Sequence, residues 1–163
     1  MIDLENLMKN YFTVEHWRSD KLLSVDKLPN AITDEGKIFL LDVMFEDTAK
    51  SATWYIGLID NAGYTQLAAA DTLAVQAGWS EFTDYAAHPT RQTWDNDAAA
   101  DGAITNTTTA DFTIDANGSE IKGVFCTNDV DSNTGKLWAT AIWATAKEVE
   151  SGDIFKVKYT VTF

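Results

Sequence analysis

The chain has 163 residues, a hydrophobic fraction of 45% and six Trp, eight Phe and five Tyr, which suits one folded domain with a packed core. Its formal net charge of -13, with lysine and arginine scattered along the sequence, repels phosphate backbones and excludes nucleic acid as a direct partner. No segment approaches the roughly 20 apolar residues of a membrane span, and Asp3 and Glu5 interrupt the apolar start, so we expect no secretory signal, no membrane partner and synthesis in the cytoplasm.

The first ten residues carry apolar side chains at spacings that suit a short amphipathic helix. These side chains are Ile2, Leu4, Leu7 and Met8. Because isolated helices shorter than about 12 residues are marginal in water, we expect this arm to dock on its own domain or on a neighbouring subunit. Residues 1–30 form the predicted N-terminal arm and first hairpin, and residues 31–163 form the predicted main domain.

A strand followed by a helix is predicted after this arm. Residues 11–17 alternate between two faces, with Phe12 and Val14 on one of them, and Ser19 and Asp20 then suggest a turn. Thr33 is a suitable N-cap for a helix that continues to about Phe45. We expect the apolar side chains of this helix to cover a face or an edge of a sheet. They are Ile38, Leu40, Leu41, Met44 and Phe45.

From Thr53 onward the sequence consists of short β-type runs separated by turn residues. The runs are 54–59, 79–85, 112–114, 121–126, 137–143 and 154–163. The last is the clearest, because Phe155, Val157, Tyr159 and Val161 alternate with mostly polar residues. The pattern predicts a mainly β fold: an antiparallel β-sandwich, jelly-roll or immunoglobulin-like, with an N-terminal arm and one or two short helices.

Two stretches between these runs are weaker in pattern. Residues 67–76 are rich in alanine and are compatible with a short helix capped by Asp71. Residues 95–109, in which Asp, Ala, Asn and Thr dominate, predict a long exposed loop.

Candidate metal and catalytic groups are few. Asp129, Asp131 and Asn133 alternate as in a calcium loop, but the Gly and Glu that such a loop needs are missing, so a plain hairpin turn is the favoured interpretation. His16 and His88 are the only imidazoles, which excludes a multi-histidine metal centre, and neither lies in a catalytic motif. We expect no enzyme activity, no cofactor and no metal.

The single cysteine and the tryptophans are expected to be mostly structural. Cys126 lies in a predicted strand, excludes an intramolecular disulfide, and is interpreted as a buried, inert thiol. Core positions are expected for Trp54, Trp138 and Trp143. Trp17, Trp79 and Trp94 lie nearer to predicted strand ends or loops and are candidates for an interface or, less favoured, a carbohydrate platform.

Several stretches resemble small proteins encoded among the virion structural genes of tailed bacteriophages. The resemblance runs from about residue 30 to the end and rests on structural rather than catalytic motifs. The matching stretches are Gly36-Lys37-Ile38-Phe39-Leu40-Leu41-Asp42-Val43, Trp54-Tyr55-Ile56-Gly57-Leu58-Ile59, Ala70-Asp71-Thr72-Leu73-Ala74, Gly78-Trp79-Ser80-Glu81-Phe82, Arg91-Gln92-Thr93-Trp94, Ile121-Lys122-Gly123-Val124-Phe125, Gly135-Lys136-Leu137-Trp138-Ala139 and Gly152-Asp153.

This resemblance implies a virion component, made in the host cytoplasm and present in many copies. The favoured expectation is a capsid decoration or cement protein that binds the outer capsid surface and stabilises the head. Its partners would be the major capsid protein and neighbouring copies of itself, in a homo-oligomer on the particle. The alternative is a tail- or fibre-associated adaptor, or a glycan- or receptor-binding module. In the favoured case the contact residues are Ile2, Leu4, Leu7, Tyr11, Phe12 and Trp17.

Overall fold

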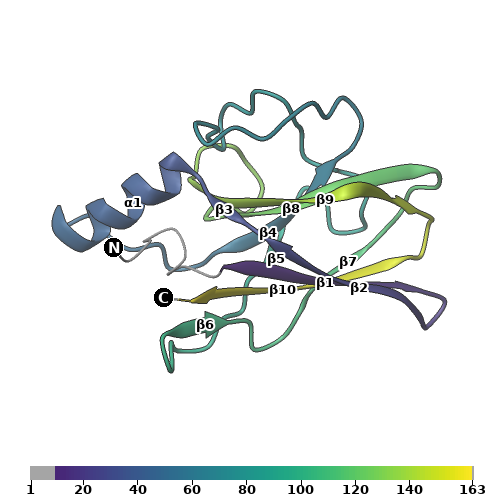
Figure 1. The fold of residues 1–163 in the computed structure, drawn as a ribbon, viewed down its shortest axis with the longest axis horizontal. Helices are drawn as coiled ribbons and strands as arrows, with labels where there is room; N and C mark the ends of the chain where they lie inside the picture. Colours follow the sequence, from purple (N-terminus) through teal and green to yellow (C-terminus); the bar gives the residue numbers. More distant parts are fainter. Residues whose placement is uncertain (1–9, 163) are drawn as a thin grey trace.

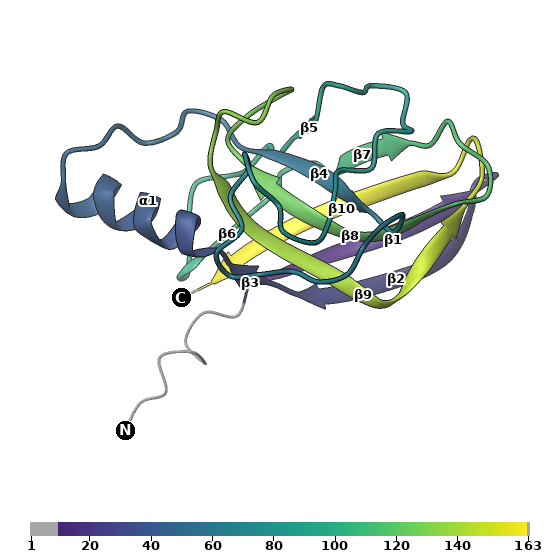
Figure 2. The same ribbon diagram turned by 90° about the horizontal axis from the view of Figure 1, so that it is seen from above.

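The chain folds into a sandwich of two antiparallel sheets, shown in a computed structural model that describes residues 10–162 (Figures 1 and 2). Sheet A contains β1 (Tyr11–Arg18), β2 (Lys21–Pro29), β6 (Ala103–Thr105), β7 (Ala110–Thr113) and β10 (Ile154–Thr162). Sheet B contains β3 (Ala31–Ile32), β4 (Tyr55–Asp60), β5 (Gln92–Thr93), β8 (Ser119–Thr127) and β9 (Leu137–Val149). The predicted antiparallel β-sandwich is confirmed.

Strand β10 organises sheet A. One of its edges pairs with β1, which continues to β2, and the other edge pairs with β7 near its start and β6 near its end. The predicted alternation of both strands is confirmed: Phe12 and Val14 of β1 and Phe155 and Val157 of β10 are buried between the sheets. The hairpin of residues 11–29 is therefore part of the same sheet as the last strand of the chain.

Sheet B is built around the long β8–β9 pair, whose two faces are both buried. Val124 and Cys126 face the interior between the sheets, whereas Phe125 belongs to a second apolar cluster. Cys126 is buried as predicted, and its burial raises the pKa of the thiol. A thiol of this kind stays protonated and inert.

The segment between β4 and β5 covers the outer face of sheet B, as seen at the top of Figure 1. Leu73 and Trp79 from this segment pack on Phe125 of β8 and Leu137 of β9. The helix predicted for residues 67–76 is wrong, because the segment consists of turns. The reason lies in Asp71, whose buried carboxylate accepts hydrogen bonds from the amides of residues 68 and 77 and so stabilises a folded loop.

Helix α1 (Asp34–Phe45) begins where the sequence predicts. Thr33 caps it, with Oγ1 accepting a hydrogen bond from the amide of Gly36 at 3.0 Å. Gly36 is the one buried residue of the helix. Glycine is needed at this position because a larger side chain would collide with the backbone of Trp138 in β9. This close approach fixes the first turn of the helix against sheet B.

A buried ionic cluster holds the opposite end of sheet A together. Asp153, fully buried just before β10, accepts hydrogen bonds of 2.8 Å from His16 Nε2 and from Arg18 Nε and Nη2 of β1. The amide of Glu150 adds a further hydrogen bond to this carboxylate. Burial alone would raise the pKa of Asp153, but the hydrogen bonds from Arg18 and His16 outweigh it and lower the pKa to about 2.

We predict that the fold loses about 2 kcal/mol of stability through Asp153 as the pH falls from about 4 to 2. A carboxyl whose folded pKa is lowered stabilises the native state above its ordinary value of 3.8, and that contribution disappears as the pH falls through the folded pKa. Chemical denaturation of the wild type at successive pH values measures this decline.

The control is Asp153→Asn, which carries no charge at any of these pH values. We expect it to be about 3 kcal/mol less stable at pH 7, since Arg18 and His16 lose a buried partner. Its acid decline should be smaller than that of the wild type. Parallel profiles for the two proteins would contradict the role given to the Asp153 charge.

Candidate functional site

Helix α1 projects from one end of the sandwich, on the left in Figures 1 and 2, and only its first turns are held against the sheets. Gly36 packs on Trp138, and Phe39 meets the edge of Trp54 with 5.8 Å between ring centroids. Beyond these contacts the helix extends away from the core. The prediction that the apolar side chains of α1 cover a face or an edge of a sheet is therefore wrong for Ile38, Leu41, Met44 and Phe45, which are exposed.

Four large apolar side chains of α1 are turned to solvent. They form the α1 ridge: Ile38, Leu41, Met44 and Phe45, with exposed fractions of 60%, 54%, 62% and 71%. Phe39, Leu40 and Val43 on the rest of the helix are only half buried. A helix that is apolar on all sides is normally buried, so α1 has the character of an element that is covered by another molecule.

The polar residues beside the ridge are mainly acidic. Asp42, Glu46 and Asp47 lie along or directly after the helix, whereas Asp34 in its first turn is paired with Lys37 at 3.5 Å. The exposed end of the molecule therefore combines an apolar centre with a negative rim.

A shallow apolar pocket of about 200 Å³ continues this surface beneath the helix. Its lining residues are Leu40, Trp54, Trp94, Ile104, Cys126, Trp138 and Val161. The indole N–H groups of Trp94 and Trp138 donate to the carbonyl and the hydroxyl oxygen of Tyr159, at 3.1 and 2.8 Å. Because these polar groups are already paired, the pocket presents carbon surface.

The residues that the sequence predicts as contacts do not gather at this end. Ile2, Leu4 and Leu7 lie outside the described residues. Tyr11 and Trp17 are half buried on the outer face of sheet A. Phe12 is wrongly predicted as a contact, because it is fully buried and stacks on Tyr159 with 4.1 Å between ring centroids. Its alternation with Tyr11 and Thr13 already places it on the core side of β1.

The sequence interpretation missed the α1 ridge as a surface. From the sequence, we expect these residues to contact a sheet, although the distribution of apolar residues around the helix indicates a different role. Apolar residues occupy every side of this helix, which is more than one sheet face can bury. What the sequence lacks is the direction in which the helix leaves the sandwich.

The remaining tryptophans support the core. Trp79, Trp94 and Trp143 are buried, with exposed fractions of 4 to 7%. Trp54 and Trp138 are partly buried against the core, as predicted for strand positions. Among the six tryptophans, Trp17 is the one on the outer face of sheet A. It belongs to neither apolar cluster of the described residues.

The loop with alternating Asp and Asn residues uses its oxygen atoms internally, as a plain turn does. The carboxylate of Asp129 accepts hydrogen bonds from the amides of Ser132, Thr134 and Gly135 at 2.7 to 3.1 Å. Burial opposes the charge, yet these hydrogen bonds hold the pKa of Asp129 well below its usual range. Within residues 10–162 no group of three or more His, Cys, Asp or Glu side chains could hold a metal ion.

We predict that substitutions of two phenylalanines of α1 differ in their effect on the free energy of unfolding. Phe45→Ser should change the free energy of unfolding by no more than about 0.5 kcal/mol, because the ring lies in solvent. Phe39→Ser should cost at least about 1 kcal/mol, because it removes the edge contact with Trp54. Thermal unfolding of the two variants measures the difference, and serine has nearly the helix propensity of phenylalanine in both. A large loss for Phe45→Ser would show that the ridge is covered within the free chain.

A family model described as "Podophage GP4 fiber I protein gp80" matches residues 32–161, which is most of the chain. No curated protein matches the sequence. In the part of the chain that the structure describes, no helix has the length and apolarity needed to cross a membrane.

Proposed function

The chain belongs to the family of the podophage GP4 fiber I protein gp80, and we propose that it is a fibre-associated component of the virion, attached to its neighbour through α1. Family membership makes it a phage structural protein. The family's name refers to a fibre protein, and this supports the fibre-associated alternative over the capsid decoration role that the sequence favours. We assign the chain a structural role without a catalytic step.

The observation that carries this proposal is the uncovered α1 ridge. Ile38, Leu41, Met44 and Phe45 are more than half exposed, and each is a side chain whose burial contributes roughly 1.5 to 3 kcal/mol. A helix that lays apolar residues at these spacings into a groove is a common mode of protein recognition. The α1 ridge is therefore the proposed attachment element.

The charges around the ridge indicate the chemistry of the partner. Asp42, Glu46 and Asp47 lie along or directly after the helix that carries the ridge, and the chain as a whole carries a net charge of -13. A second copy of the same chain would be repelled by this rim, whereas a groove lined with apolar residues and bordered by Lys or Arg would be attracted. We propose a different virion protein with such a groove as the partner. The major capsid protein and neighbouring copies, the partners expected from the sequence, are separate outcomes of the test.

We predict that the double variant Leu41→Ser/Phe45→Ser is incorporated into phage particles at least about tenfold less than the wild type, since burial of two large side chains is lost. The matched control is Val25→Ser, which removes another exposed apolar residue, 55% exposed, from β2 of sheet A. Quantitative mass spectrometry of purified particles assembled with each variant measures the number of copies.

Localisation of the wild-type chain in those particles by cryo-electron microscopy completes the test. A position on the fibre or its attachment site, with α1 in a groove, supports the proposal. Copies spread over the capsid lattice would overturn the fibre assignment, and normal incorporation of the double variant would overturn the role of α1. A stable homo-oligomer in solution that the double variant disrupts would replace the foreign partner by a second copy.

A further inference from the structure

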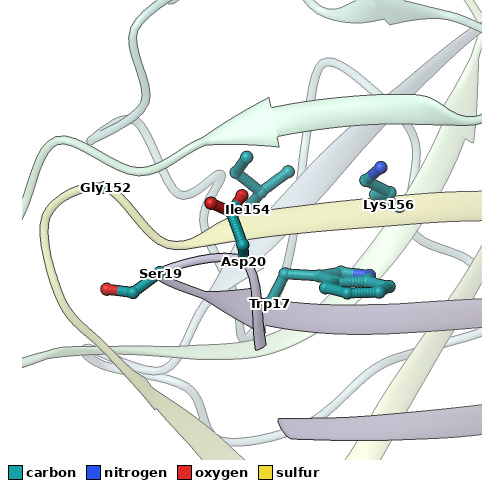
Figure 3. Close-up of a pocket in the computed structure, with 6 residues that line it drawn as sticks. All are labelled: Trp17, Ser19, Asp20, Gly152, Ile154 and Lys156. Carbon is teal, nitrogen blue, oxygen red and sulfur yellow. The ribbon is translucent and has the colours of Figure 1, made fainter. Parts of the chain in front are cut away.

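A second surface feature lies at the opposite end of the sandwich from α1. A shallow pocket of about 270 Å³ opens on the outer face of sheet A, between the β1–β2 turn and the start of β10 (Figure 3). It is lined by Trp17, Ser19, Asp20, Gly152, Ile154 and Lys156. The volume is slightly below the range of pockets for drug-sized ligands, and it suits one small ring.

The aromatic side of this pocket is held in a fixed orientation. The indole Nε1 of Trp17 donates a 2.7 Å hydrogen bond to Glu15 Oε2 on the same face of β1. Across the strand pair, Ile154 lies opposite Trp17, and the ammonium group of Lys156 lies 5.5 Å from the indole centroid. Figure 3 shows these side chains on neighbouring strands, facing the same side of the sheet.

The rim of the pocket is formed at a backbone cost. Ser19 and Asp20, the two residues of the β1–β2 turn, have φ angles of 48° and 61°. Glycine, asparagine and aspartate adopt the left-handed conformation most readily, so its cost of roughly 1 kcal/mol falls mainly on Ser19. Within the described residues neither of these exposed side chains makes a hydrogen bond that would compensate this cost. Figure 3 shows the carboxylate of Asp20 beside Ile154, whereas the hydroxyl of Ser19 points away from Trp17 and Lys156.

The base of the pocket is rigid. Arg18, which precedes the turn, and Asp153, which precedes Ile154, are joined by two hydrogen bonds of 2.8 Å. This pair fixes the ends of β1 and β10 relative to each other. The aromatic ring on one strand and the ammonium on the other are thereby held in a constant relation, as a binding site requires.

We propose that this pocket binds a neutral pyranose residue of a saccharide. The indole face of Trp17 offers an apolar platform for the C–H groups of the sugar ring. The carboxylate of Asp20 accepts hydrogen bonds from sugar hydroxyls, and the ammonium group of Lys156 donates one. The opposite charges of Asp20 and Lys156 balance each other, and the net charge of -13 repels anionic saccharides. This binding function is independent of attachment through α1.

The test uses an array of oligosaccharides with neutral, N-acetylated and uronic acid residues, probed with the full chain. The wild type should bind neutral members, and Trp17→Ala should weaken that binding at least about tenfold. Two lysines of the same strand form a matched pair: Lys156→Ala should weaken binding, whereas Lys158→Ala, on the same face but outside the pocket, should not.

Asp20→Gly separates a binding role from a structural one. Glycine adopts a positive φ without strain, so this variant should keep a melting temperature close to that of the wild type while it abolishes saccharide binding. A residue kept only for the turn would show no loss of binding on this change. The same variant controls for misfolding, because it is expected to be about as stable as the wild type.

Three results would overturn the proposal. The first is that no member of the array binds above the level of Trp17→Ala. The second is saccharide binding that Trp17→Ala and Asp20→Gly leave unchanged. The third is binding to uronic acid polymers alone that Lys158→Ala weakens as much as Lys156→Ala does. Each of these results leaves the attachment role of α1 unaffected.

Discussion

Strand β10 is the constraint on which both ends of this molecule depend. It pairs with β1 along one edge and with β7 and β6 along the other, so the first and the last strands of the described chain are neighbours in one sheet. At its start, Asp153 ties it to His16 and Arg18. Toward its end, Tyr159 stacks on Phe12 and accepts hydrogen bonds from the indole N–H groups of Trp94 and Trp138. A shift of β10 by one residue would expose its apolar face and break both sets of contacts.

The two sheets differ in how their outer faces are used. The segment between β4 and β5 packs Leu73 and Trp79 on the outer face of sheet B and makes that sheet apolar on both sides. Sheet A carries Trp17, Glu15, Lys156 and Lys158 on its outer face, a mixture that suits contact with water or with a polar ligand. The difference follows from sequence, since β8 has apolar residues on both faces whereas β10 alternates.

The sequence predicts elements well where a local pattern determines them. The alternation of residues 154–163 and the Thr33 cap are of this kind, because period and capping chemistry depend on neighbours along the chain. The course of residues 67–76 depends on where the carboxylate of Asp71 finds its donors, and the exposure of the α1 ridge depends on the path of the helix relative to sheet B. The proximity of Trp17 and Lys156 requires the β1–β10 register, which joins residues far apart in sequence and has no local signal.

The separation of the two surfaces has a physical rationale. Attachment through α1 would bury apolar residues and rigidify the end of the sandwich where Trp54 and Trp138 lie, whereas the pocket at Trp17 must stay open to solvent. Placing them at opposite ends of β10 lets one end be covered while the other remains accessible. The hydrogen-bonded pair of Arg18 and Asp153 fixes the strand ends next to the Ser19–Asp20 turn, whose two residues have positive φ angles. The same sheet that supports the attached end therefore keeps the free end rigid enough to bind a ligand.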